Sequence, residues 1–308
     1  VSVDNPVDKA DAIVVRFSVP PSAEAPHYGS TGALDLYVNN QFRQAITLHS
    51  KYAYQYTKGG NKPSEGTPAK RHYNEFRFKL KGEALERGNT LTLRKGENSL
   101  LKEYNIDLID FEVIPDPRNR PGNSVSVKDF GAVGDGVTDD TKSFLTARDT
   151  AREENKSLWI PAGTFLVSSQ KSTKLIFENQ TVRGAGVWHT TLLRRPPVGS
   201  ERKHRTAIVL QGKSILSDVY IKNELFYEGD YVILANGEGW KIERIWSHNT
   251  GPCWLSGNDG VIRDSRMSDH WGDGININNS NRNTPHSLGN IRDISFLESI
   301  LVRKYNRY

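Results

Sequence analysis

The chain has 308 residues, of which 36% are hydrophobic and 25% charged, with 26 glycines and 12 tyrosines. This composition is typical of a folded, glycine-punctuated soluble protein, and the length allows about two domains. The formal net charge is +5, but acidic residues interrupt nearly every basic stretch, so the sequence does not indicate nucleic-acid binding. No window approaches the ~18 apolar residues of a membrane span, and we therefore predict no membrane partner.

Residues 1–115 are predicted to form a β-sandwich. Short stretches alternate between apolar and polar residues, turn signals separate them, and no helical pattern occurs. The predicted strands cover 12–17, 33–38, 44–48, 76–80, 90–93 and 106–113.

Residues 116–123 form the predicted linker, because three prolines and a glycine crowd the segment from Pro115 to Asn123. Residues 124–308 form the second predicted domain. It opens with a strand and a glycine-rich loop, followed by a helix over 141–154, for which residues 138–141 offer N-cap chemistry. A helix before a long strand-only region would cover the open end of a stack of strands.

A loose internal repeat then predicts stacked coils. Four similar segments carry an aliphatic residue in second place, at Leu216, Ile242, Ile262 and Ile291. The steps between them are about one turn of a parallel β-solenoid, in which each coil buries its apolar side chains only against its neighbours. An aspartate recurs within the repeat at 218, 264 and 293, where we expect a coil corner.

The cysteine and the acidic cluster have structural interpretations. Cys253 is the only cysteine, which excludes an intrachain disulfide and a Cys-based zinc site. Its apolar context favours a buried structural thiol. Asp135, Asp139 and Asp140 could suggest calcium, but a loop turn and a helix N-cap explain them better. We predict neither a metal nor a cofactor.

Two motifs resemble those of the pectate-lyase-type right-handed parallel β-helix superfamily: residues 127–141 and residues 158–165. The resemblance implies an all-β protein, with an N-terminal β-sandwich, a β-helix and an N-terminal capping helix. The architecture hosts lyases, hydrolases, epimerases and depolymerases, so it does not define the reaction.

A narrower resemblance is to glycoside hydrolase family 87, the α-1,3-glucanases and mycodextranases. It rests on residues 181–192, on residues 271–278, and on three stretches of the first domain, residues 36–39, 44–48 and 71–77. The resemblance implies hydrolysis of α-1,3-glucan or mixed α-1,3/α-1,4-glucan with inversion. It also implies a polysaccharide partner and a secreted, extracellular location.

Glycoside hydrolysis needs at least two carboxylic acids, one to protonate the leaving oxygen and one to activate water or attack carbon. The resemblance makes Asp273 a catalytic carboxylate, as the aspartate of the motif Asp-Gly-Ile-Asn; a turn before a strand is the structural alternative. Further substrate-binding candidates are Trp271, whose ring could stack on sugars, together with Asp269, His270, Asn276 and Trp254.

The family places a Gly-Asp-Asp motif about one coil after this aspartate, and the sequence has none. We therefore expect the β-helix to be incomplete at its C-terminus, because the chain is truncated or its tail has diverged. The sequence begins at Val1 without a Met or a signal h-region, which predicts a mature, trimmed or fragment N-terminus. Two alternatives stay open at this point. One is a polysaccharide lyase on the same fold, which would need a base and a cation such as calcium. The other is a carbohydrate-binding remnant without catalysis.

Overall fold

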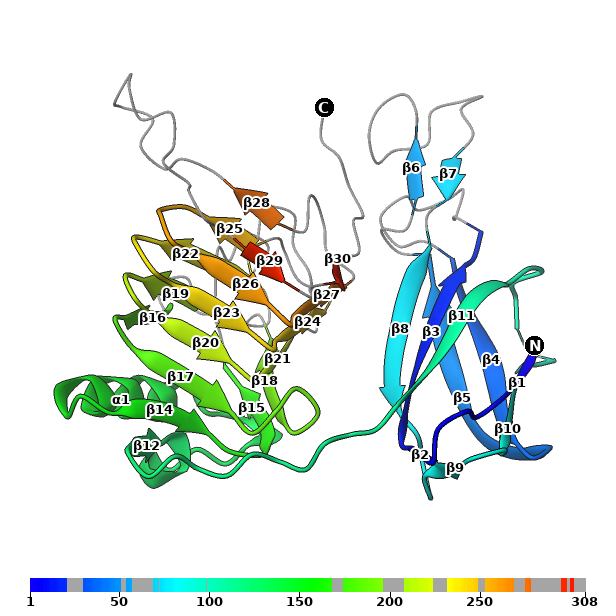
Figure 1. The fold of residues 1–308 in the computed structure, drawn as a ribbon, viewed down its shortest axis with the longest axis horizontal. Helices are drawn as coiled ribbons and strands as arrows, with labels where there is room; N and C mark the ends of the chain where they lie inside the picture. The colour runs from blue at the N-terminus through cyan, green and yellow to red at the C-terminus, as the bar shows by residue number, and fades with distance from the viewer. Residues whose placement is uncertain are drawn as a thin grey trace. The chain divides into compact units, whose positions relative to one another are not determined.

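A computed structural model describes most of the chain, and the described residues fall into two compact units that divide between Asp116 and Pro117 (Figure 1). The described residues are 1–20, 30–50, 54–56, 69–71, 73–97, 99–167, 174–195, 208–223, 232–248, 253–268, 275–277, 295–297 and 300–301. Of these, 54–56, 69–71, 276–277, 295–297 and 300–301 are described by their backbone alone.

The first unit is a sandwich of two antiparallel sheets, as the sequence predicts. One sheet has the strand order β1-β10-β4-β5 and the other β11-β3-β8. The bounds of the first are β1 Ser2–Asp4, β10 Thr90–Lys95, β4 Thr31–Val38 and β5 Gln41–His49. Those of the second are β11 Asn105–Glu112, β3 Ala12–Ser18 and β8 Asn74–Lys79. Two short pairs are β2 (Lys9–Ala10) with β9 (Leu85–Glu86) and β6 (Tyr54–Tyr56) with β7 (Ala69–Arg71).

Alternating side chains of the two sheets build one core. In β4, Leu34, Leu36 and Val38 are buried, whereas Asp35 and Tyr37 are only half-buried. Residues of the opposite sheet join the same cluster; these include Ile13, Val15 and Phe17. The period-2 pattern of the sequence therefore marks the inward face of each strand.

The second unit is a parallel β-helix with three sheets. The first sheet has the order β12-β14-β17-β20-β23-β26-β29, the second β13-β15-β18-β21-β24-β27-β30, and the third β16-β19-β22-β25-β28. Neighbouring strands within each sheet are parallel, as the register of β17 and β20 illustrates. Figure 1 shows the coils stacked one on the next. The repeat in the sequence therefore predicts the architecture correctly.

The strands of the β-helix are short throughout. In the first sheet they are β12 Ser124–Ser126, β14 Ser157–Ile160, β17 Thr181–Gly184, β20 Ile215–Ser217, β23 Lys241–Glu243, β26 Val261–Arg263 and β29 Ser295–Leu297. In the second they are β13 Asp135–Asp139, β15 Gly163–Leu166, β18 Thr190–Arg194, β21 Tyr220–Asn223, β24 Trp246–His248, β27 Arg266–Ser268 and β30 Ile300–Leu301. In the third they are β16 Leu175–Glu178, β19 Ile208–Gln211, β22 Ile233–Asn236, β25 Cys253–Leu255 and β28 Ile275–Ile277.

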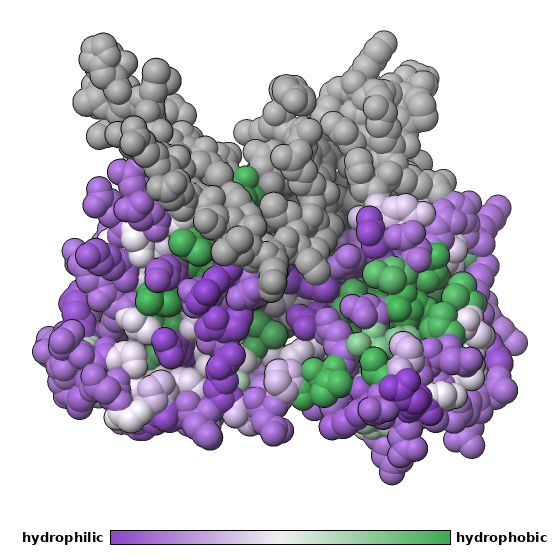
Figure 2. Space-filling view, viewed as in Figure 1, coloured by the Kyte–Doolittle hydropathy of each residue, from purple (hydrophilic) through white to green (hydrophobic). Residues whose placement is uncertain are grey.

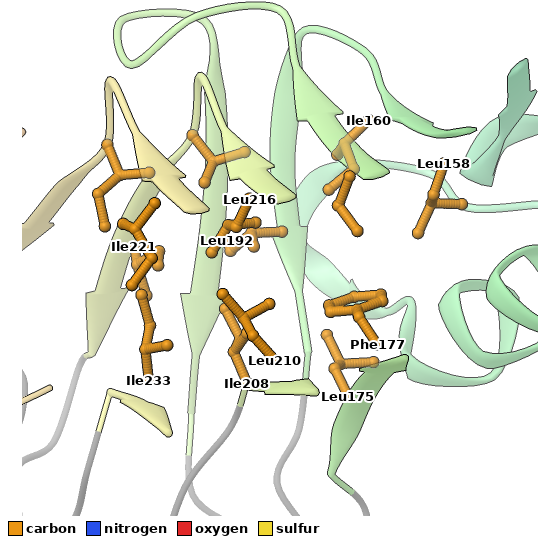
Figure 3. Packing of buried hydrophobic residues seen from close by; sticks show 14 of the residues in the cluster. Leu158, Ile160, Leu175, Phe177, Leu192, Ile208, Leu210, Leu216, Ile221 and Ile233 are labelled. Atoms are coloured by element: carbon orange, nitrogen blue, oxygen red, sulfur yellow. The ribbon is translucent and has the colours of Figure 1, made fainter. Parts of the chain in front are cut away.

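The interior of the β-helix is filled by aligned aliphatic and aromatic residues (Figure 3). Leu158, Val182, Leu216, Ile242 and Ile262 occupy one continuous register row of the first sheet, and each is fully buried. Burying one such side chain contributes about 1.5–3 kcal/mol. Because every coil supplies one member of each row, a coil gains this burial only when its neighbours are in place.

A helix closes the first end of the β-helix, as predicted. Helix α1 (Thr141–Glu153) buries Phe144, Ala147 and Ala151 in the same core, and Phe144 meets Phe165 edge-to-face at 5.6 Å between ring centroids. A short 3₁₀ helix, η1 (Val127–Phe130), precedes it. No helix in the part of the chain that the structure describes is long and apolar enough to cross a bilayer.

The predicted N-cap chemistry is only partly correct. Asp140 stands at the N-cap, but its side chain makes no capping bond to α1. Its carboxylate instead accepts hydrogen bonds from the backbone N–H of Val133 (2.7 Å) and of Gly134 (3.1 Å). The Asp140 side chain is therefore bonded to the glycine-rich loop and not to the helix. At the start of α1, the Asp139 carboxylate accepts a hydrogen bond from the Thr141 N–H.

The corner between the first and second sheets holds aspartates, as the repeat predicts. Asp218 and Asp264 both have positive φ, 62° and 51°, a conformation that aspartate tolerates better than most residues. Asp218 is also buried, and its carboxylate accepts from Arg244 Nε at 2.8 Å and pairs with Arg118 Nε at 2.9 Å. This ion-pair network was not predicted.

The last member of the repeat was assigned wrongly. The sequence placed a coil at residues 290–294, with Ile291 continuing the row of Ile262. The strand that pairs with β26 is β29, and its register sets Phe296 beside Ile262. The segment 290–294 lies outside the described residues. A short degenerate pattern can recur by chance in a sequence. Which segment pairs with β26 depends on the register between coils, which the local pattern does not specify.

The connection between the units is held at both ends. The Ile114 N–H donates to the Asp11 carboxylate in the sandwich, and the Arg118 N–H donates to the Ala185 carbonyl in the β-helix at 2.9 Å. Arg120 forms a two-pronged ion pair with Asp129 of η1, at 3.0 and 2.6 Å. The end of the connection that includes Arg118 and Arg120 is therefore fixed to the β-helix.

Candidate active site

The third sheet positions the candidate site. Its strands alternate between inward and outward residues, and the register aligns the coils into rows. One inward row consists of Leu175, Ile208, Ile233, Cys253 and Ile275, the first four of which are buried.

Cys253 in this row is inert. Complete burial raises the pKa of its thiol to about 12, so almost no thiolate forms near neutral pH. Its Sγ lies 3.9 Å from Met267 Sδ in the core. The expected buried structural thiol is confirmed.

An outward row of the same sheet leads to the predicted Trp254. Ile176, Val209, Leu234 and Trp254 follow one another in register, and Asn276 comes next. Ile176 is 37% exposed, Leu234 and Trp254 are half-buried, and Val209 is buried. An apolar outer row that ends in an indole fits the apolar face of a sugar ring better than it fits a charged ligand.

The structure brings two of the predicted site residues into neighbouring strands. Asn276, in β28, pairs in register with Trp254, in β25. The other four, Asp269, His270, Trp271 and Asp273, lie outside the described residues, in the connection between β27 and β28.

A polar and aromatic cluster stands on the neighbouring second sheet, next to that connection. His248 Nδ1 and Trp246 Nε1 both lie within hydrogen-bonding distance of Ser268 Oγ, at 3.0 and 3.1 Å. Tyr220 stacks on Trp246 with 4.3 Å between ring centroids, and Trp188 meets it edge-on. Trp246 is only 6% exposed, so it serves in packing rather than as a platform for sugar.

This cluster contains none of the site residues predicted above, and Ser268 and Tyr220 are two members that sequence reasoning missed. Ser268 is the last residue before the connection that carries Asp273, and it fixes the imidazole of His248 one coil below. In the sequence, His248 and Ser268 are separated by about one coil, and this was the only signal that could have linked them. The register shows that the two residues are paired.

The carboxylates of the acidic cluster near α1 accept hydrogen bonds from neighbouring backbone N–H groups. The Asp135 carboxylate accepts from the N–H groups of Val137 and Thr138, which lowers its pKa. Asp139 and Asp140 accept the backbone hydrogen bonds described above. Across the residues the structure describes, no group of three or more His, Cys, Asp or Glu side chains is arranged to hold a metal ion.

Comparisons with known proteins agree with this architecture. Residues 5–114 match the family model described as "Alpha-1,3-glucanase catalytic domain D1", and residues 124–229 match "Rhamnogalacturonase A/epimerase, pectate lyase-like". A curated relative, the pre-neck appendage protein of Bacillus phage B103, is 31% identical over 157 residues, which are 50% of this chain and 15% of that protein.

Two solved structures span both units. The Agl-KA catalytic domain is 27% identical with a TM-score of 0.71, and the match covers 89% of this chain and 50% of that one. A variant of the catalytic domain of a family 87 α-1,3-glucanase, in complex with tetrasaccharides, is 18% identical with a TM-score of 0.65, over 90% of this chain and 48% of that one. At that identity the second match shows the fold alone. The chain spans about half the length of these structures.

The sandwich and the three-sheet coil define the class: a pectate-lyase-like parallel β-helix preceded by a β-sandwich. Within that class, the first unit is similar to the alpha-1,3-glucanase catalytic domain D1, and the chain as a whole is similar to the Agl-KA catalytic domain.

Proposed function

We propose that the protein is a glycoside hydrolase that cleaves α-1,3-glucan, or mixed α-1,3/α-1,4-glucan, by acid/base hydrolysis with inversion. The observation that carries the proposal is the match of residues 5–114 to the alpha-1,3-glucanase catalytic domain D1. The similarity to the Agl-KA catalytic domain, at 27% identity over 89% of the chain, extends over both units. We further propose that the protein is secreted and acts outside the cell, since its polymeric substrate is too large to be taken up intact.

In this proposal Asp273 is one of the catalytic carboxylates. It stands two residues before Ile275, so its Cα lies within ~7.6 Å of the Ile275 Cα, because consecutive Cα atoms are 3.8 Å apart. That start of β28 is next to β25, which carries Trp254 in the outward row. In this proposal Asp273 supplies one of the two carboxyl groups that glycoside hydrolysis requires, and the sugar ring stacks on the apolar row that ends in Trp254.

The test is the release of reducing sugar from α-1,3-glucan by the wild-type protein and by Asp273→Asn. Loss of a catalytic carboxylate is expected to lower kcat by about 10²–10⁴-fold, since acid/base catalysis contributes on this scale. NMR of the first-formed product reports the anomer, and an inverted anomer supports the single-displacement mechanism.

Asp259→Asn is the matched control. Asp259 is exposed, lies in the turn between β25 and β26, and has a φ of 53°, which asparagine tolerates. Its activity is expected to equal that of the wild type. Equal activity of all three proteins would remove Asp273 from the mechanism, and a retained anomer would refute inversion.

A second candidate function is glycan binding without cleavage. It is favoured by the apolar outward row that ends in Trp254, because a sugar ring can stack there whether or not a glycosidic bond is cleaved. This function predicts binding of α-1,3-glucan oligosaccharides with no sugar release, unchanged in Asp273→Asn.

A further inference from the structure

Two adjoining surface pockets open on the first sheet of the β-helix, and both are lined by Arg183 and Pro121. The cap pocket, of about 320 Å³, lies between the last turn of α1 and the strands β14 and β17; its lining includes Arg152, Lys156, Gln180 and Arg183. The corner pocket, of about 310 Å³, lies at the turn that follows β17; its lining includes Arg118, Trp159, Arg183, Asp218 and Arg244.

The cap pocket is positively charged. Arg152, Lys156 and Arg183 line it, and none of the described residues that line it carries a carboxylate. Two of these cations have acidic partners outside the lining, Asp149 at 3.2 Å from Arg152 and Glu154 at 2.7 Å from Lys156. Arg183 is exposed and forms no ion pair among the described residues, so its charge is uncompensated.

The corner pocket is also positively charged. Arg118, Arg183 and Arg244 line it with one carboxylate, that of Asp218. Asp218 is buried and already shared by Arg118 and Arg244, so it cannot neutralise Arg183. Figure 2 shows strongly hydrophilic residues on this face of the β-helix. Together the two pockets form a groove with Arg183 at its centre.

A buried acceptor also points to a ligand with hydrogen-bond donors. Gln180 lines the cap pocket and is only 4% exposed. Its Nε2 donates to the Arg148 carbonyl at 2.9 Å, but its Oε1 is buried without a donor among the described residues. A buried unpaired acceptor costs about 1–3 kcal/mol, and a small shift of the side chain would offer it to a ligand hydroxyl.

We propose that this groove binds a carbohydrate that carries oxyanion groups, either carboxylates or phosphates. A simple anion would leave Gln180 Oε1 unpaired, and a neutral sugar would leave Arg183 without a counter-charge; an acidic sugar satisfies both. Guanidinium groups bind carboxylate and phosphate oxygens in pairs. The groove is independent of the proposed hydrolysis, because Asp273 precedes a strand of the third sheet.

The experiment measures binding of three probes to the full chain by calorimetry: an oligogalacturonide, a phosphorylated maltodextrin and a neutral α-1,3-glucan oligosaccharide. Arg183→Gln is expected to weaken binding of at least one acidic probe about tenfold, on the scale of one charge-assisted hydrogen bond. Arg183→Lys keeps the charge and is expected to lose less. Whichever acidic probe responds identifies the oxyanion.

Lys241→Gln is the matched control, since it removes one exposed cation from β23 of the same sheet, away from both pockets. Its binding is expected to equal that of the wild type, and thermal melts of all variants check folding. Equal losses in Arg183→Gln and Lys241→Gln would reveal non-specific attraction and overturn the proposal. So would the absence of acidic-probe binding, or an effect of Arg183→Gln on the neutral probe alone.

Discussion

Substituting Gly257 with alanine tests whether close stacking at the corner between the third and first sheets holds the coils together. Gly257 has a φ of +97°, and a Cβ built there would lie 1.6 Å from the carbonyl oxygen of Gly237 and 2.6 Å from its carbonyl carbon. Both atoms belong to the backbone of the coil below, so neither can rotate away. Relief requires the two coils to separate.

The expected cost has two parts. An alanine in the left-handed region costs about 1–2 kcal/mol, and forcing extra volume into a packed contact adds about 1–3 kcal/mol. Gly257→Ala should therefore destabilise the β-helix by about 2–5 kcal/mol. Gly239→Ala is the control: its φ is +74°, but the new Cβ would meet only the flexible Lys213 side chain, with Cγ at 3.3 Å. It should cost only the first part.

Urea unfolding followed by tryptophan fluorescence measures both variants. All six tryptophans lie between residues 159 and 271, so the signal reports the second unit alone. The midpoint should fall further for Gly257→Ala than for Gly239→Ala, with the slope unchanged. Equal midpoints would show that the backbone conformation, and not the contact between coils, limits both positions, which would refute the reasoning.

Three further outcomes are expected. Asp218→Asn keeps the shape and the positive φ but removes the charge between Arg118 and Arg244, and should lower the free energy of unfolding by about 2 kcal/mol in the same assay; an unchanged midpoint would contradict this. Burial raises the pKa of Glu243, but ion pairs with Arg263 and Arg244 outweigh it and hold that pKa below its usual 4.5. The stability that Glu243 contributes is therefore present above pH 4.5 and is lost as the pH falls through its lowered pKa, so Glu243→Gln should cost about 1 kcal/mol at pH 7 and progressively less in acid; a constant difference would argue against the ion pairs. Because the pKa of the Cys253 thiol is about 12, a thiol reagent should react only as fast as the β-helix unfolds, and rapid labelling of the native protein would disprove its burial.

The sequence predicted the elements whose signals are local. The six predicted strands of the sandwich appear within three residues of their predicted limits, as β3 and β4 illustrate, whereas β1 was not predicted. Their alternation directly reflects burial on one face. Helix α1 begins at the predicted Thr141 and ends one residue early.

Features that depend on coil register were not predictable. Phe296, rather than Ile291, continues the first-sheet row, because pairing is chosen between strands that local sequence does not connect. The bonds from Arg118 and Arg244 to Asp218 span 100 and 26 residues. Of the candidate site, Trp254 and Asn276 stand on adjacent strands, whereas the role of Asp273 stays a prediction, since it rests on a family resemblance.

The anchored connection between the units limits how independently they can act. One backbone anchor is at Ile114 and the next at Arg118, so only residues 115–117, two of them prolines, lie between. The four Cα–Cα steps from Ile114 to Arg118, at ~3.1–3.6 Å each, span at most about 14 Å. A tether this short keeps each unit at a high effective concentration for the other. Inserting a flexible spacer after Pro115 would lower that effective concentration without altering either fold.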